Sequence, residues 1–288
     1  MDYLFAVLTF FAIYAVLATS LNIVVGHAGL LSIGHAALFC VGAYVSALAS
    51  LRLGLAVPLG AVLAIVVTAI VGGLVTVPLL RLSGDYFILG SLGIQIIVVD
   101  IIRNLDVITE GPRGLASIPR PSLGGLAVES NLSFAIVYGV VAVIACLLAR
   151  YLMRSPYGRV LEATRDDEDA ASALGRNVVW TRLRAFILSA ALAGLAGSMY
   201  AHFVSFIDPT SFGFSESIYI LSMVVIGGMG TARGPLLGAA LLLTAPEIMR
   251  FVGASTGSDA YIRQLLYAVL LIAFAYFRPQ GIGGKRLA

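Results

Sequence analysis

The chain has 288 residues, of which 60% are hydrophobic and 11% are charged, and its formal net charge is +3 at pH 7. A soluble domain carries about 25% charged residues, so this chain has too few polar groups to cover its own surface in water. The composition excludes an ordinary soluble domain, and so small a net charge gives no support for a nucleic-acid partner.

Long apolar runs predict an all-α polytopic membrane protein. A spanning helix needs about 20 mostly apolar residues, because each adds about 1.5 Å across a hydrocarbon core of about 30 Å. The first run has no positive charge before it and is too long for a cleaved signal peptide, so we expect a retained span. About nine spans, with eight to ten as the range, form a single transmembrane domain over 1–288. They are predicted at 3–25, 30–51, 57–80, 86–102, 133–152, 184–206, 215–232, 235–252 and 261–277.

Basic residues predict the orientation, because Lys and Arg collect on the cytoplasmic side of membrane proteins. The stretch 150–184 holds seven arginines. When this stretch is placed inside, twelve of the eighteen basic residues fall inside and six fall outside. The N-terminus is then external and the C-terminus cytoplasmic. The loop at about 154–183 is cytoplasmic, and the loop at about 103–132 is external.

The cytoplasmic loop contains the clearest local signal. Acidic residues stabilise the first turn of a helix, where backbone N–H groups are unpaired, and glycine suits the position just beyond its end. The acids at 166–169 and Gly175 therefore predict a helix of about two turns, which is too short to be stable without packing. It is either a solvated surface helix or a coupling helix that enters a groove of a cytoplasmic partner. Its apolar side would consist of Ala170, Ala171, Ala173 and Leu174.

A glycine-rich segment covers the junction between two of the predicted spans. Glycines spaced four apart allow close helix contact, but Pro235 favours a break followed by the first turn of a new helix. We interpret the segment as a tight inner turn with close backbone packing, and a mobile gate hinge is the alternative. Its residues are Gly227, Gly228, Gly230, Gly234 and Pro235.

Polar side chains inside the predicted spans should face other helices or water, because hydrocarbon does not satisfy them. The candidates for lining a solute path are Asn22, Ser32, His35 and Gln95. On the external side, Arg103, Arg113 and Arg120 are either contacts for an acidic patch on a partner protein or ordinary solvated loop residues. Charges of this kind mainly set the association rate and its salt dependence.

Motifs for catalysis are missing from the sequence. There is no GxxxxGK[ST] segment, so the chain has no P-loop with which to bind ATP, and neither HExxH nor GxSxG occurs. Cys40 and Cys146 lie in apolar runs without the spacing of a disulfide framework or a metal site. We therefore expect no enzymatic activity, and neither a metal nor a cofactor bound by this chain.

Seven stretches carry recognisable motifs in order along the chain. They are Gly29–Tyr44, Arg81–Tyr86, Thr109–Gly114, Gly158–Asn177, Pro209–Ser217, Gly227–Gly230 and Arg278–Gly281. Together they resemble the LivM-type permease of branched-chain amino acid ABC importers. The most specific are the inner loop, GRVLEATRDDEDAASALGRN, and the RPQG end. Glu110 departs from the pattern, at a position where glycine is common in the family.

The resemblance implies the fold of an ABC importer permease, one of two that form the path for branched-chain amino acids (Leu, Ile, Val). It implies a heterodimer with an H-type permease, two cytoplasmic ATPase subunits that bind ATP and Mg²⁺, a periplasmic binding protein, and a place in the bacterial inner membrane. It also implies that the inner loop couples the permease to the ATPases. The coupling residues would be Arg159, Glu162, Ala163, Arg165, Asp166, Asp167, Glu168, Ala170, Ala171, Leu174 and Gly175.

Three alternatives stay open at this point. Related permeases serve urea, short amides or aromatic acids, so the same machinery could carry one of these solutes. A different class is an ion-coupled secondary transporter, and a third is a membrane scaffold that transports nothing. Secondary transporters place charges and broken helices at the bilayer midplane, whereas the charges of this chain collect in the inner loop.

Overall fold

The protein is an all-α bundle, as the apolar runs predict. The computed structural model describes residues 2–123, 126–127, 130–251, 269, 272 and 281–283. Eight helices in this part of the chain correspond to the first eight predicted spans, and the ninth, at 261–277, lies almost wholly outside the described residues. They are α1 (Asp2–Asn22, continued by the π-helical η1, Ile23–His27), α2 (His35–Arg52), α3 (Val57–Leu79), α4 (Asp85–Asn104), α6 (Asn131–Arg154), α9 (Val178–Val204), α10 (Phe214–Gly227) and α11 (Gly234–Phe251).

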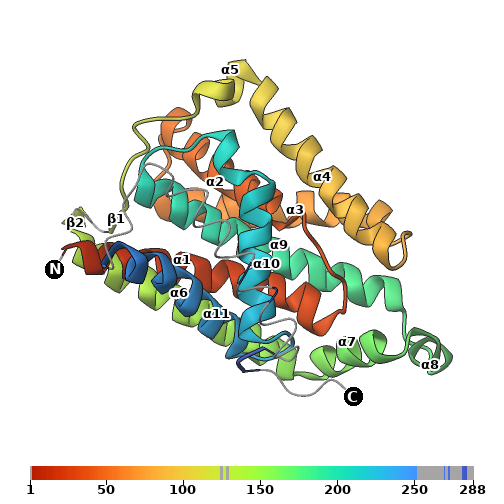
Figure 1. Ribbon diagram of the computed structural model, residues 1–288. Helices are drawn as coiled ribbons and strands as arrows, with labels where there is room; N and C mark the ends of the chain where they lie inside the picture. The colour runs from red at the N-terminus through yellow and green to blue at the C-terminus, as the bar shows by residue number, and fades with distance from the viewer. Residues whose placement is uncertain are drawn as a thin grey trace.

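Six of these helices are long and apolar enough to cross a membrane, namely α1 with η1, α2, α3, α4, α6 and α9. The described apolar parts of α10 and α11 are shorter. The connections at one end are α5 (Asp106–Thr109), η2 (Gly111–Arg113) and the two-residue antiparallel strands β1 (Ser122–Leu123) and β2 (Leu126–Ala127). The opposite end carries α7 (Pro156–Asp166) and α8 (Glu168–Ala173), as Figure 1 shows.

Burial divides the helices into an inner and an outer set. The most apolar windows of α1, α2 and α9 are 61%, 78% and 56% buried, whereas those of α3, α4 and α6 are 22–28% buried. The outer helices expose many large apolar side chains, such as Val66 on α3, Ile97 on α4 and Leu147 on α6. Exposed apolar surface on this scale suits a hydrocarbon solvent. In Figure 1, α4 stands on the opposite side of the inner helices from α6.

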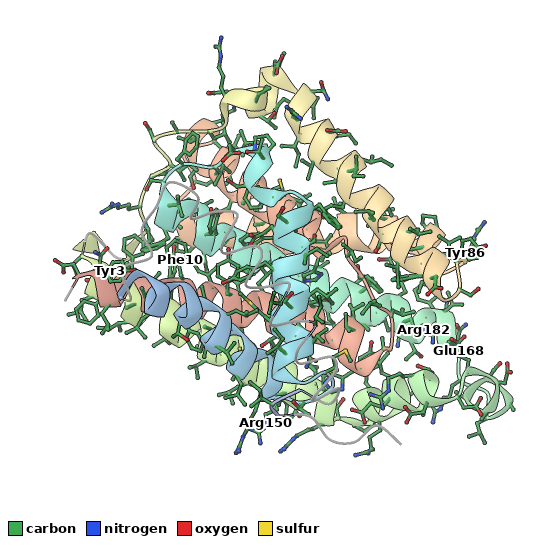
Figure 2. All side chains as sticks on the ribbon, in the orientation of Figure 1. Tyr3, Phe10, Tyr86, Arg150, Glu168 and Arg182 are labelled. Carbon is green, nitrogen blue, oxygen red and sulfur yellow. The ribbon has the colours of Figure 1, made fainter. Side chains whose placement is uncertain are left out.

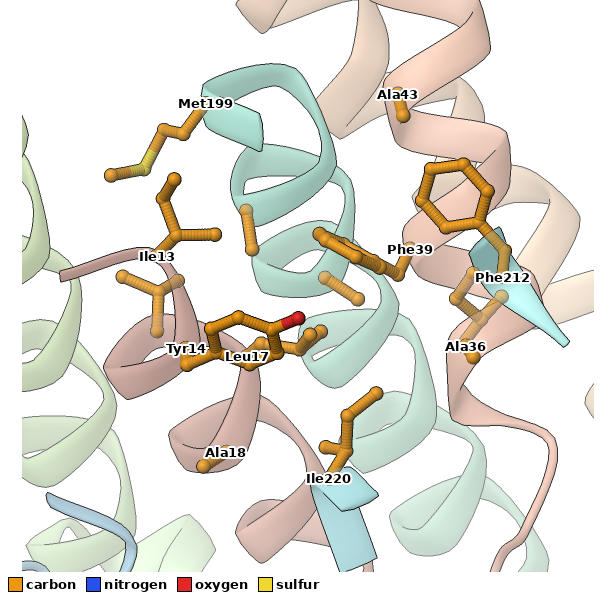
Figure 3. Packing of buried hydrophobic residues seen from close by; sticks show 14 of the residues in the cluster. Ile13, Tyr14, Leu17, Ala18, Ala36, Phe39, Ala43, Met199, Phe212 and Ile220 are labelled. Atoms are coloured by element: carbon orange, nitrogen blue, oxygen red, sulfur yellow. The ribbon is translucent and has the colours of Figure 1, made fainter. Parts of the chain in front are cut away.

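Aromatic side chains fill the centre of the bundle. Phe39 of α2 packs against Phe212 of η3 (Pro209–Phe212) with ring centroids 5.2 Å apart, and Tyr14 of α1 packs against Tyr219 of α10 at 5.5 Å. Figure 3 shows Phe39 and Phe212 together with Ile13, Leu17 and Ile220. The core therefore joins the first two helices to the segment that follows α9.

Three predicted spans differ from the structure by five or six residues at one end, and one of these is 184–206, since α9 begins at Val178. Residues 30–34 precede α2 and are not helical, so this helix begins at His35 instead of residue 30. The freed N–H groups of Ala36 and Ala37 donate to Ser217 Oγ and Gln95 Oε1, at 3.2 and 2.7 Å. The seventh predicted span ends at Gly227 instead of residue 232, because Gly228 has φ +112°, outside the helical range.

Close backbone contact joins α2 to α9. A Cβ placed on Gly42 would lie 2.5 Å from the Gly194 Cα and 2.6 Å from its carbonyl oxygen. Small residues that let helix backbones approach are a usual basis of association in membranes. Any side chain at Gly42 must therefore push the two inner helices apart.

We predict that Gly42→Leu lowers the free energy of unfolding by about 1–3 kcal/mol, the usual effect of overpacking. The matched control is Gly139→Leu on α6, where no atom lies within 4 Å of the added Cβ. Thermal unfolding of the two purified variants in one detergent makes the comparison. Equal melting temperatures for the two variants would contradict the packing described here.

Candidate functional site

The inner loop folds as two helices joined at Asp167. Pro156 lies in the first turn of α7, where its missing N–H costs nothing. Asp167 is extended, at φ −154°, and its carboxylate accepts a hydrogen bond from the Ala170 N–H at 2.9 Å, as an N-cap does. The acids of the predicted short helix thus divide differently from our expectation. Asp166 ends α7, whereas Glu168 and Asp169 form the first turn of α8.

Gly175 ends α8, as predicted. Its φ is +76°, its N–H donates to Ser172 O, and the Arg176 N–H donates to Ala171 O. This pair of hydrogen bonds is a Schellman motif, which favours glycine at the left-handed position.

The predicted apolar side of α8 is largely uncovered. Ala171 is 5% exposed and packs inward, but Leu174 is 82% exposed, and Ala170 and Ala173 are exposed as well. The bundle therefore covers only Ala171 of these four residues, and the other three stay available to solvent or to a partner. An ion pair between Glu168 and Arg182 of α9 holds the helix in place, and Figure 2 shows the two side chains together.

α7 packs against the inner ends of α1, α6 and α9. Leu161 is fully buried in a cluster that includes Ile23 and Met153. The Tyr157 hydroxyl donates to the carbonyl of Thr181 at 2.9 Å. Burial raises the pKa of Tyr157 to about 12, so this hydroxyl keeps its proton at neutral pH.

Two side chains of α7 bind the π-helical end of α1. Nη1 of Arg165 donates to the carbonyl oxygen of Gly26 at 2.7 Å, and the same guanidinium pairs with Asp166. Nδ1 of His27 lies 2.8 Å from Oε1 of Glu162. A π-helical segment leaves carbonyl groups in non-standard positions and is common at functional sites, and here Arg165 engages one of them. Among the other predicted coupling residues, Arg159 and Ala163 are exposed.

The glycine segment forms a tight turn on the same end of α1. The Asn22 side chain accepts from the Gly230 N–H at 2.9 Å and donates to the carbonyl of Thr231 at 3.1 Å. A Cβ on Gly26 would lie 2.2 Å from the Gly230 nitrogen. Gly234 begins α11 with Pro235 in its first turn, as predicted. The geometry matches a tight turn with close backbone packing.

A cavity of about 1010 Å³ opens beside this network. Its lining includes Asn22, which we had predicted to line a path. Ser32 lines a separate small void between α2, α3 and α4. Gln95 and His35 serve as buried hydrogen-bonding groups. The Gln95 side chain accepts from the Ala37 N–H and donates to the Phe212 carbonyl. His35 Nε2 lies 2.6 Å from Ser20 Oγ.

The three arginines that we predicted to be external are exposed at the opposite end of the bundle, around α5 and the following loop. Arg120 lies over the Phe134 ring, 5.8 Å from its centroid. Between Arg103 and Arg113, Glu110 has φ +59°. This left-handed conformation favours glycine, which gives a physical reason for the glycine that is common at this position in the family, and Glu110 adopts it despite its side chain.

Sequence reasoning missed two side-chain pairs that join residues far apart in the chain. One is the contact between His27 and Glu162, and the other lies in the bundle, where the Tyr14 hydroxyl donates to Oε1 of Glu216 at 2.7 Å. Glu216 lies in the first turn of α10, and an acid inside a predicted span was the signal that could have marked it. Its partner is 202 residues away in the chain, beyond the reach of local patterns.

These features define the class of protein: a polytopic α-helical membrane protein in which a short helix between two spans, α7, contacts the end of the first span. A family model described as "Branched-chain amino acid transport system / permease component" matches residues 3–275. The chain belongs to this family and is a permease component of a transport system, which confirms the resemblance found in the sequence.

Individual relatives agree with the family. The high-affinity branched-chain amino acid transport system permease protein LivM of Salmonella typhimurium is 36% identical over 94% of this chain and 67% of its own length. LivM of Escherichia coli is 35% identical with the same coverage. LivH of Salmonella typhimurium is 26% identical over 94% of this chain and 91% of its own length. No solved structure matches the chain.

We predict that Asn22→Ala lowers the free energy of unfolding by about 1–3 kcal/mol, because it leaves the Gly230 N–H and the Thr231 carbonyl without their partner. Asn104→Ala is the matched control, since that amide is exposed and, among the residues that the structure describes, it binds Asp100 O of its own helix. The control should change stability by less than about 0.5 kcal/mol. Equal melting temperatures in detergent would show that the Asn22 bridge contributes nothing.

Proposed function

We propose that the chain is the M-type half of a heterodimeric permease that imports branched-chain amino acids across the bacterial inner membrane. The proposal rests on the LivM relatives, which are named for that solute class and match 94% of the chain. The similarity to LivH supports an H-type permease as the other half. Urea, short amides and aromatic acids are the alternative solutes.

The remaining partners follow from the same proposal. Two cytoplasmic ATPase subunits bind ATP and Mg²⁺ and drive transport, and a periplasmic binding protein delivers the solute. The inner loop is cytoplasmic in this arrangement, as is the C-terminus, which agrees with the concentration of arginines at that end of the bundle. Arg103, Arg113 and Arg120 then face the binding protein.

α8 is the element that we propose to enter a groove of an ATPase subunit. The observation that carries this role is the exposure of Leu174, Ala170 and Ala173 on a helix whose other side is held by Ala171 and the Glu168–Arg182 pair. Small side chains beside one exposed leucine allow close approach to a partner surface. Motion of α8 would reach the end of α1 through Arg165 and Glu162 of α7.

We predict that Ala170→Trp abolishes solute-stimulated ATP hydrolysis by the assembled transporter in proteoliposomes. The indole should block entry of α8 into the groove, while the permease still inserts and binds its permease partner. Ala116→Trp, at an exposed position of the external loop, is the matched control and should leave hydrolysis unchanged. The chain purified alone should hydrolyse no ATP.

Normal coupling in the Ala170→Trp transporter would contradict the role of α8, which would then be a surface connection only. Ala171→Trp is a poor substitute for this test, because Ala171 is buried and its replacement would unfold α8 itself.

A further inference from the structure

Arginines from three separate elements converge on the cavity at the inner end of the bundle. Arg150 and Arg154 come from the last turns of α6, Arg159 and Arg165 from α7, and Arg233 from the turn before α11. Two carboxylates, those of Glu162 and Asp166, also line it. In Figure 2, Arg150 lies well apart from the Glu168–Arg182 pair. The lining of the cavity extends along α7 from Arg159 to Asp166, and it includes no residue of α8.

The positive charge of this cavity is largely unbalanced. Five arginines face two carboxylates, so three positive charges are in excess. Asp166 is paired with Arg165, and Glu162 lies against His27. Between residues that the structure describes, no ion pair or hydrogen bond engages the side chains of Arg150, Arg154, Arg159 and Arg233. A hollow with walls of low dielectric constant and charges of one sign concentrates counter-ions, so this cavity attracts an anion.

Part of the cavity wall is apolar. It includes Ile23 of η1 and Cys146, Ala149 and Met153 of α6, and Cys146 lies one helical turn further into the span than Arg150. The volume of about 1010 Å³ is at the upper end of the range for small-molecule sites, about 300–1,000 Å³. A basic cavity whose wall on α6 is partly apolar matches an amphiphile better than a small soluble anion.

The outer surface of α6 continues from the arginines into the hydrocarbon zone. Leu147 and Tyr151 are 56% and 74% exposed and lie three residues before Arg150 and Arg154, which makes them neighbours on the helix surface. Val143 extends the same apolar strip toward the other end of the helix. An acyl chain can lie along this strip while its head group occupies the cavity.

We propose that this cavity binds the phosphate head group of an anionic phospholipid from the inner leaflet, with the acyl chains on α6. Basic pockets between spanning helices on the cytoplasmic side are suited to such head groups. The site does not depend on α8 or on the identity of the transported solute. It requires only that this end of the bundle faces an anionic membrane surface.

The test uses the full-length chain in nanodiscs that contain phosphatidylcholine with a minority of phosphatidylglycerol. After extraction into detergent, native mass spectrometry counts the phosphatidylglycerol and phosphatidylcholine that stay bound. We expect the wild type to retain phosphatidylglycerol selectively. A triple variant, Arg150→Gln with Arg154→Gln and Arg233→Gln, should lose on the order of 100-fold in relative affinity, since each arginine near an anionic surface contributes about fivefold.

Two further variants separate the site from general charge effects. The first is a control triple variant in which Gln replaces Arg81, Arg176 and Arg184. It removes the same amount of positive charge from the same end of the bundle, outside this cavity, and should keep the selective retention of phosphatidylglycerol. Replacement of Arg150, Arg154 and Arg233 by Lys keeps the charge and should retain most of the binding. Thermal unfolding in detergent with inorganic phosphate alone distinguishes a soluble anion from a lipid.

Two results would overturn the proposal. One is retention that does not depend on head-group charge, or that falls equally in both glutamine triple variants. The other is thermal stabilisation by inorganic phosphate equal to that by a short-chain phosphatidylglycerol, which would make the ligand a soluble anion.

Discussion

The close approach of Gly26 to Gly230 is the contact on which the inner end of the protein depends. With 2.2 Å between the Gly230 nitrogen and the place of a Cβ on Gly26, no other residue fits at position 26 without moving the turn. The contact brings the Gly230 N–H to Asn22 and leaves the Gly26 carbonyl free for Arg165. One pair of glycines thus holds α1, the turn before α11 and α7 in register.

The interrupted helices follow from the need to satisfy every backbone polar group in a membrane interior. Where the chain leaves helical geometry before α2, Ser217 and Gln95 take over the hydrogen bonds of the freed N–H groups. Where α1 becomes π-helical, Arg165 takes one carbonyl. Ser217, Gln95 and Arg165 therefore lie at breaks in the helices, where they bind backbone groups that the helices leave unpaired.

The sequence predicted the parts of this structure that depend on local chemistry. Hydropathy found the spans, Pro235 marked the start of α11, and Gly175 marked the end of α8. The sequence did not reveal that residues 30–34 lie outside the helix, because Leu30, Leu31 and Ile33 are as apolar as a spanning helix requires. Nor did it reveal α7, whose short amphipathic pattern is dominated by charged residues.

Contacts between distant residues were also beyond prediction. Glu162 and His27 are 135 residues apart, and the sequence alone gave His27 no acidic partner. The candidate coupling residues were identified by resemblance to a family, and their structural roles differ from one another. Arg165 and Glu162 contact the first span, Asp167 caps α8, and Leu174 faces outward. A list of candidate residues could not make these distinctions.

The central claim is that α7 and the glycine turn move as one body with the inner end of α1. The most direct measurement is an electron–electron spin distance between labels at two exposed positions, Ala163 on α7 and Ala232 in the turn, with Cys40 and Cys146 replaced. In the assembled transporter, the distance distribution should be the same without nucleotide and with trapped ATP, and it should broaden in an Arg165→Ala variant. If the distance between the two labels changes when ATP is trapped in the protein that retains Arg165, the claim is contradicted.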